Sequence, residues 1–322
     1  MSDIQGSYSR VNYLLRPTKQ VERKMIIEAL QKLLPLGYDI PGYRYVGMGS
    51  IYYVDFVLFH KYLHITDMLC VEVRPIERRM SFNRPYEFVN LHMGKMAEVL
   101  PQLDRARSHL MWLDYDTPPN EQILSDLATA VKVTAPGSVV IITVTAQLSE
   151  VERAANIEEM KERNQKWAAI YSEWFRVYVD EVTPAMLTRK NIALLFANVL
   201  RNLCIENVRG RRDVDVDFLP LFNYRYADGQ SMLTVGGLID TTERINQLRE
   251  SRFLEEPVIV TGEEPVGITV PQLTVREKLW LDQNLRAVGE GADELAFELE
   301  PAEVESYIQY AKYYPIYYET LV

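Results

Sequence analysis

The chain has 322 residues, 48% of them hydrophobic and 25% charged, which is the balance of a globular protein with a large buried core. Its formal net charge of −10 disfavours the broad basic surface that grips duplex DNA, although a local basic patch remains compatible with it. No stretch approaches the roughly 18 apolar residues of a membrane-spanning helix, and residues 1–16 lack the apolar core of a secretion signal. We therefore expect a cytoplasmic protein that does not enter the membrane.

The first half of the chain alternates between expected strands and helices. Apolar side chains recur on one face of residues 18–34, which predicts an amphipathic helix ahead of the alternation. Strands are expected over residues 43–47, 67–73, 88–91, 109–115 and 137–145, and helices over residues 51–63, from residue 76, and over residues 120–133. The last of these strands is an unbroken apolar run, which is typical of a parallel sheet covered by helices on both faces.

The second half ends the sheet and adds an appendage. Helical regions are expected over residues 149–179 and 188–208, and the Asp228-Gly229 pair predicts a hairpin between strands 219–226 and 232–238. Residues 255–271 contain prolines and glycines and predict an irregular linker, after which Thr274 and Glu277 form a capping box that opens a helix. We thus divide the chain into an N-terminal helical segment (1–40), an α/β domain (41–250), and a linker with a small helical appendage (251–322).

The end of the first expected strand carries a glycine turn, Gly47-Met48-Gly49-Ser50. Glycines at such a turn let the backbone approach a ligand, and the helix that follows offers free N–H groups. A tight structural turn would look the same, because the third glycine of the dinucleotide fingerprint is missing. The turn alone leaves both interpretations open.

A carboxylate at the end of the second strand favours the ligand interpretation. Glu72 follows the glycines by about 20 residues, the spacing of the acid that accepts hydrogen bonds from ribose hydroxyls in nucleoside-binding folds. The alternative is a surface charge that pairs with Arg74 or Arg78. Spacing and position together favour the ribose.

Four features together resemble a class I, Rossmann-like S-adenosylmethionine-dependent methyltransferase. They are the run from Tyr45 to Ser50, the acid Glu72, the strand end Leu113–Asp116 and the late Asp228-Gly229 hairpin. More narrowly, the chain is similar to the prokaryotic family of putative O-methyltransferases. The resemblance covers about residues 40–240. It implies a seven-stranded, mostly parallel sheet with an antiparallel last strand, S-adenosylmethionine as the cofactor, and residues 41–250 as the cofactor-binding domain.

The resemblance also implies which residues hold the cofactor. The glycine turn would lie under the methionine part, Glu72 would hold the ribose, and residues 92–94 would flank the adenine. The implied cofactor-binding residues are Gly47, Met48, Gly49, Ser50, Glu72, His92, Met93, Gly94 and Asp114. Two departures stand out: Gly94-Lys95 occupies the place of an adenine-side acid, and Tyr45-Val46 precedes the glycines where many members carry an acid. Asp114 is then expected to replace that second acid.

The fourth strand brings Asp114, Tyr115 and Asp116 to the same sheet edge, and we predict these three as the catalytic residues. The two acids could orient the cofactor amine, deprotonate a hydroxyl or hold a divalent cation. A metal needs more oxygen ligands than this cluster offers, so no metal site is predicted. An N-cap for the helix near Asn120 is the structural alternative for one aspartate, and we assign that role to Asp116. We expect transfer to oxygen with Asp114 in the main role.

Other functions remain as alternatives. Base amino-methylation is disfavoured because residues 116–120 lack the aromatic of the nucleic-acid amino-methylases. A nicotinamide-dependent enzyme is disfavoured because Tyr52 occupies the place of the third glycine of its fingerprint. The runner-up is a non-catalytic cofactor-binding or regulatory subunit of a larger assembly. The acceptor, whether small molecule, protein or RNA, is not resolved. The tyrosine-rich end suits packing, a protein partner or a homo-oligomer interface, and its residues include Tyr313, Tyr314, Tyr317 and Tyr318.

Overall fold

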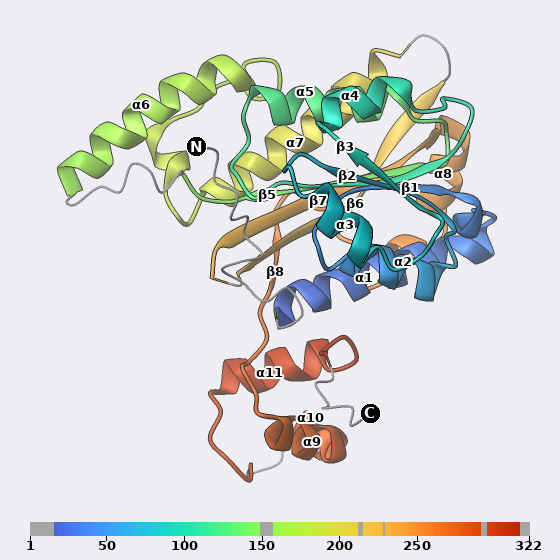
Figure 1. The fold of residues 1–322 in the computed structure, drawn as a ribbon. Coiled ribbons are helices and arrows are strands. Elements are labelled where there is room, and N and C mark those ends of the chain that lie inside the picture. Colours follow the sequence, from blue (N-terminus) through green and yellow to red (C-terminus); the bar gives the residue numbers. More distant parts are fainter. Residues whose placement is uncertain (1–15, 149–156, 212–214, 228, 291–294, 316–322) are drawn as a thin grey trace.

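The computed structural model describes residues 16–148, 157–211, 215–227, 229–290 and 295–315 (Figure 1). Eight strands form a single sheet in the order β3-β2-β1-β4-β5-β7-β6-β8. Their bounds are β1 (Arg44–Met48), β2 (Asp67–Glu72), β3 (Val89–Met93), β4 (His109–Asp114), β5 (Ser138–Thr145), β6 (Val216–Ala227), β7 (Ser231–Thr241) and β8 (Val266–Ile268).

The strand directions confirm the predicted mostly parallel sheet. Strands β1 to β5 run parallel to one another, and β7 pairs antiparallel with both β5 and β6. The hairpin thus supplies the antiparallel last strand of the seven that the sequence predicts, although Asp228 of its turn lies outside the described residues. An eighth strand is a correction: β8 pairs with residues 224–226 of β6, inside the segment predicted as an irregular linker. This short strand satisfies backbone groups along the outer edge of β6.

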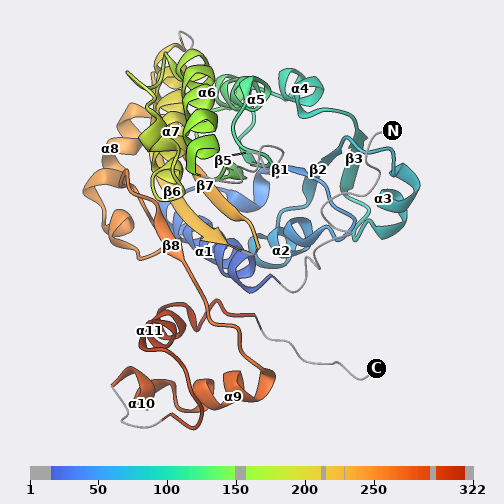
Figure 2. The ribbon, with the colours of Figure 1, turned by 90° about the vertical axis from the view of Figure 1, so that its left-hand side faces the viewer.

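Helices cover both faces of the sheet. The bounds are α1 (Pro17–Leu33), α2 (Val54–Leu63), α3 (Glu77–Asn83), α4 (Met96–Val99), α5 (Glu121–Val133), α6 (Ile157–Phe175), α7 (Ile192–Arg209) and α8 (Thr242–Glu250). Figures 1 and 2 show α1 and α2 on one face and α4, α5 and α7 on the other. Alternate residues of each strand enter the two cores, as Tyr45 and Val46 of β1 show. Among the described residues no helix is long and apolar enough to cross a membrane.

Helix α1 lies close to its predicted position. Pro17 occupies the first turn, where its missing N–H is not needed, and Gly37 ends the helical region with a φ of 87°. The helix packs against the sheet through Ile26 and Leu30, which are fully buried. The N-terminal segment is therefore a layer of the same core as β1 and β4.

The C-terminal appendage has a core of its own. Helices α9 (Val275–Gln283), α10 (Leu285–Gly289) and α11 (Pro301–Tyr310) gather around Leu281, Val288, Tyr307 and Tyr314. The predicted capping box of Thr274 and Glu277 opens α9. Figures 1 and 2 show this unit beyond the α1 face of the sheet.

A polar contact ties the appendage to α1. Glu28 of α1 accepts hydrogen bonds from Lys312 and from the hydroxyl of Tyr313, each at 2.9 Å. Tyr313 and Tyr314 are buried, so these two tyrosines pack within the chain, while Tyr317 and Tyr318 lie outside the described residues.

Candidate cofactor and active site

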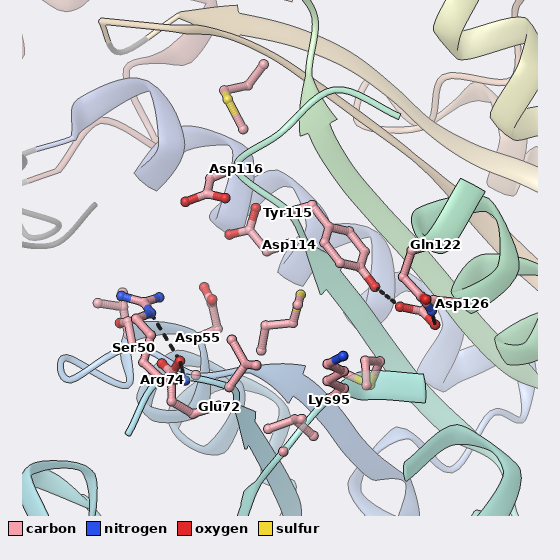
Figure 3. A pocket seen from close by; sticks show the side chains of 18 of the residues that line it. Ser50, Asp55, Glu72, Arg74, Lys95, Asp114, Tyr115, Asp116, Gln122 and Asp126 are labelled. Atoms are coloured by element: carbon pink, nitrogen blue, oxygen red, sulfur yellow. Dashed lines mark hydrogen bonds and ion pairs between the residues drawn. The ribbon is translucent and has the colours of Figure 1, made fainter. Parts of the chain in front are cut away.

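A cavity of about 470 Å³ opens at the carboxyl ends of β1, β2 and β4 (Figure 3). This is the edge at which open parallel sheets bind ligands, and the volume lies within the usual range for small-molecule sites. The predicted site residues that line it are Met48, Gly49, Ser50, Glu72, Gly94, Asp114, Tyr115 and Asp116. The structure therefore brings together most of the residues that sequence reasoning selected.

The glycine turn packs closely against neighbouring side chains, as the structural interpretation of this turn predicts. A Cβ at Gly49 would lie 2.6 Å from the Sγ of Cys70 and 2.9 Å from the Cε of Met80, so the missing side chain lets β1 pack against β2 and α3. Gly47 is not among the lining residues, and the space beside it is filled by the ring of Tyr45. Ser50 and Met48 remain as lining residues. Both glycines thus serve close packing next to the cavity.

Glu72 ends β2 with one oxygen satisfied and the other not. Its Oε1 accepts hydrogen bonds from the backbone N–H of Arg74, at 2.9 Å, and lies 3.1 Å from the Nε of the same residue. Its Oε2 is buried and has no hydrogen-bond partner among the described residues. The side chain is 2% exposed and lines the cavity. A buried carboxylate oxygen without a donor is costly, and a ligand hydroxyl would supply that donor.

The end of β3 contributes fewer residues to the cavity wall than the sequence predicts. Gly94 lines the cavity, and its backbone N–H donates to the carbonyl of Glu72 at 2.9 Å. His92 and Met93 are not lining residues, and the His92 ring instead lies 3.6 Å from the Glu98 carboxylate. The cavity wall after β3 is thus formed by Gly94, Lys95 and Met96, of which only Gly94 was predicted to bind the cofactor.

The three predicted catalytic residues at the end of β4 have different surroundings. Asp114 lines the cavity with its side chain 26% exposed. The Tyr115 hydroxyl donates to Asp126 at 2.6 Å, and Figure 3 shows it turned away from Asp114. Burial and Asp126 raise the pKa of Tyr115, so its phenol stays protonated at neutral pH. Asp116 is exposed, and Asn120 caps α5 by accepting from the N–H of Ile123, which corrects the capping role assigned to Asp116.

Helix α1 adds charged groups that sequence reasoning missed. Lys19, Glu22 and Arg23 are at most 2% exposed. The Lys19 ammonium lies 2.9 Å from Glu22, 3.4 Å from Asp114 and 4.6 Å from the centre of the Trp112 ring. Burial alone would lower the pKa of Lys19, but Asp114 and Glu22 outweigh it and raise the pKa, so the ammonium stays charged.

Arg23 completes this cluster at the cavity wall. Its Nε pairs with Asp55 at the start of α2, and its Nη1 is buried without a hydrogen-bond partner among the described residues. Both Arg23 and Asp55 line the cavity. A signal for these groups exists in the sequence, because Lys19, Glu22 and Arg23 fall on the same helical stripe as apolar Ile26.

The comparisons with known proteins identify the family. Residues 11–322 match the protein family described as "Putative O-methyltransferase". The chain belongs to this family. No curated protein matches the chain significantly.

Solved methyltransferase structures share a limited likeness with the chain. Trm1 from Pyrococcus horikoshii, solved with S-adenosylmethionine, is 11% identical with a TM-score of 0.48, over 76% of this chain and 61% of that one. An O-methyltransferase family protein from Burkholderia thailandensis is 10% identical with a TM-score of 0.34, over 68% and 59%. TomG from Streptomyces achromogenes is 16% identical with a TM-score of 0.34, over 65% and 79%. The chain thus spans about three fifths of the first two relatives.

S-adenosylmethionine, the cofactor that the sequence resemblance implies, is compatible with the polar groups that line the cavity. Its ribose hydroxyls are donors of the kind that the buried Oε2 of Glu72 lacks. Its carboxylate matches the buried Nη1 of Arg23, and its ammonium matches the carboxylates of Asp55 and Asp114. The cavity therefore offers a hydrogen-bond acceptor for the ribose hydroxyls and groups of opposite charge for the carboxylate and the ammonium of the cofactor.

Proposed function

We propose that the protein is a methyltransferase that transfers the methyl group of S-adenosylmethionine to an oxygen atom of a hydroxylated acceptor. The observation that carries the proposal is the cavity lined by the unpartnered oxygen of Glu72 and the carboxylate of Asp114, at the ends of β2 and β4 on either side of β1. The family match over residues 11–322 supports the same activity. Bound S-adenosylmethionine supplies an electrophilic methyl group on a positively charged sulfur.

Methyl transfer to oxygen needs a base close to the hydroxyl group of the methyl acceptor. The acceptor loses the proton of its hydroxyl as its oxygen gains the methyl group, and S-adenosylhomocysteine is the second product. A hydroxyl is neutral at pH 7, so transfer to oxygen is helped by a carboxylate that orients the hydroxyl or takes up its proton. We assign this role to Asp114, whose carboxylate lines the cavity 3.4 Å from the Lys19 ammonium. Tyr115 supports the site through Asp126 instead.

The Asp114 assignment is tested by comparing two conservative variants. Asp114→Asn keeps the size and removes the charge, and Asp116→Asn makes the same change at an exposed position of the same cavity wall. Release of S-adenosylhomocysteine is measured with a panel of hydroxylated acceptors at saturating cofactor. We expect Asp114→Asn to lower turnover by roughly 10², the usual contribution of a positioned base, and Asp116→Asn to change it little. Equal turnover in all three proteins would remove Asp114 from the mechanism.

A lack of turnover would favour the alternative function, a non-catalytic subunit. Tight binding of S-adenosylhomocysteine without methyl transfer to any member of a broad panel would favour a non-catalytic cofactor-binding subunit. We place the protein in the cytoplasm as part of the proposal. Cys70 and Cys204 are buried free thiols, and burial raises the pKa of each to about 12, which suits a reducing compartment in which neither needs a partner.

A further inference from the structure

A second cavity, of about 820 Å³, lies beside the first at the same edge of the sheet. It is bounded by the segment after β5, by the end of β6 and by the hairpin turn that leads into β7. Strand β6 runs parallel to β5, because both pair antiparallel with β7. The carboxyl ends of β5 and β6 therefore face the same side as those of β1, β2 and β4, where ligands of such sheets bind.

This second cavity is positively charged. Three arginines line it: Arg163 from α6, Arg189 from the segment before α7, and Arg225 from β6. None of the described lining residues is Asp or Glu. Arg189 and Arg225 form no ion pair with any residue in the described part of the chain. In a chain with a net charge of −10, two guanidinium groups at one cavity with no carboxylate partner among the described residues favour an anionic ligand.

A short polar chain connects the two cavities. Tyr226 lines the second cavity, and its hydroxyl accepts a hydrogen bond from Lys19 at 2.9 Å. Lys19 in turn lies 3.4 Å from Asp114 in the first cavity. Across the hairpin, Tyr226 pairs with Met232, which lines the first cavity. Two side chains, Tyr226 and Lys19, thus link the second cavity to Asp114, the carboxylate assigned to the methyl acceptor.

We propose that the second cavity binds the acceptor, and that the acceptor is a small hydroxylated molecule carrying an oxyanion group, a phosphate or a carboxylate, held by Arg189 and Arg225. This inference rests on the proposed function. The planar fork of arginine matches both oxyanions, which accept two parallel hydrogen bonds from it. The volume suits a metabolite rather than a long polymer. The acidic net charge also disfavours RNA, whose backbone requires a broad basic surface.

The test measures binding of simple oxyanions to the full chain by calorimetry at low ionic strength. The probes are inorganic phosphate and malonate. In the test variant, Arg189→Gln is combined with Arg225→Gln. The control combines Arg209→Gln with Arg252→Gln, which removes the same charge from two exposed arginines, with side chains 69% and 93% exposed, that pair with glutamates elsewhere.

We expect the wild type and the control to bind one probe alike, and the test variant to bind it roughly tenfold more weakly or worse, because two charge-assisted contacts are lost. The preferred probe identifies the oxyanion. Failure of both probes to bind the wild type, or equal loss in test and control, overturns the inference. Competition of single-stranded RNA with the probe would also overturn it, in favour of a polymeric acceptor. S-adenosylhomocysteine is titrated in parallel: its failure to bind any of the proteins refutes the proposed function, whatever the probes show.

Discussion

Replacing Glu72 by Gln isolates the unsatisfied carboxylate oxygen of the first cavity. The amide keeps the shape of the side chain, and its carbonyl oxygen can still accept from the N–H of Arg74, as Oε1 does at 2.9 Å. The buried Oε2, which has no donor in the described structure, becomes an NH₂ group that cannot accept a hydrogen bond from a ribose hydroxyl. The ligand-free fold should therefore survive, while cofactor binding should weaken.

The size of the effect follows from the chemistry of that oxygen. A hydrogen bond to a charged group contributes about 1.5–3 kcal/mol, so the dissociation constant for S-adenosylhomocysteine should rise about 10- to 150-fold. Calorimetry at 25 °C measures this, with Glu206→Gln on α7 as the control, because Glu206 is an exposed partner of Arg209 away from the cavity. The loss should persist with adenosine and vanish with 2′,3′-dideoxyadenosine. Wild-type affinity for S-adenosylhomocysteine in Glu72→Gln would refute the ribose assignment.

Three further variants test the packing and charge around the site. Lys19→Met should lower the free energy of unfolding by about 3–5 kcal/mol, because it leaves Glu22 buried without its cation, and adding Glu22→Gln should restore part of the loss in denaturant titrations. Gly49→Ala should lower the melting temperature, since its Cβ would lie 2.6 Å from the Sγ of Cys70; an unchanged midpoint would contradict that packing. Burial lowers the pKa of His109 to about 4, below its value of about 6.5 in the unfolded chain. Protonation of His109 should therefore lower the free energy of unfolding of the wild type by about 3 kcal/mol as the pH falls from 7 to 4. His109→Gln should lose less over that range, and identical pH profiles would argue against a neutral buried His109.

The sheet and one side of the site could be predicted from local patterns. The alternation of apolar strands with helices predicts a parallel sheet, and the carboxyl ends of parallel strands meet at one edge. The positions of Glu72 and Asp114 at strand ends therefore predict that both line the same cavity. The hairpin of β6 and β7 could likewise be predicted from the residues of its turn. Such features depend on a few neighbouring residues.

The missed features depend on residues far apart in the chain. Lys19 contacts Asp114 and Tyr226, which are 95 and 207 positions away, and its charged stripe looks like the solvated side of a helix until those partners are known. Strand β8 has three residues and forms because β6 offers it an edge. The close packing at Gly47 and Gly49 could not be predicted for the same reason, since the side chains that fill the space beside them are known only in the folded chain.

A crystal structure of the protein with S-adenosylhomocysteine directly tests whether the first cavity binds the cofactor. The account predicts the ligand in the first cavity, with a ribose hydroxyl within hydrogen-bond distance of the Oε2 of Glu72 and its carboxylate beside the Nη1 of Arg23. Asp114 should lie on the side of the sulfur rather than of the adenine. Binding of the ligand at another place, or in this cavity with Glu72 and Arg23 still unpartnered, would contradict the account.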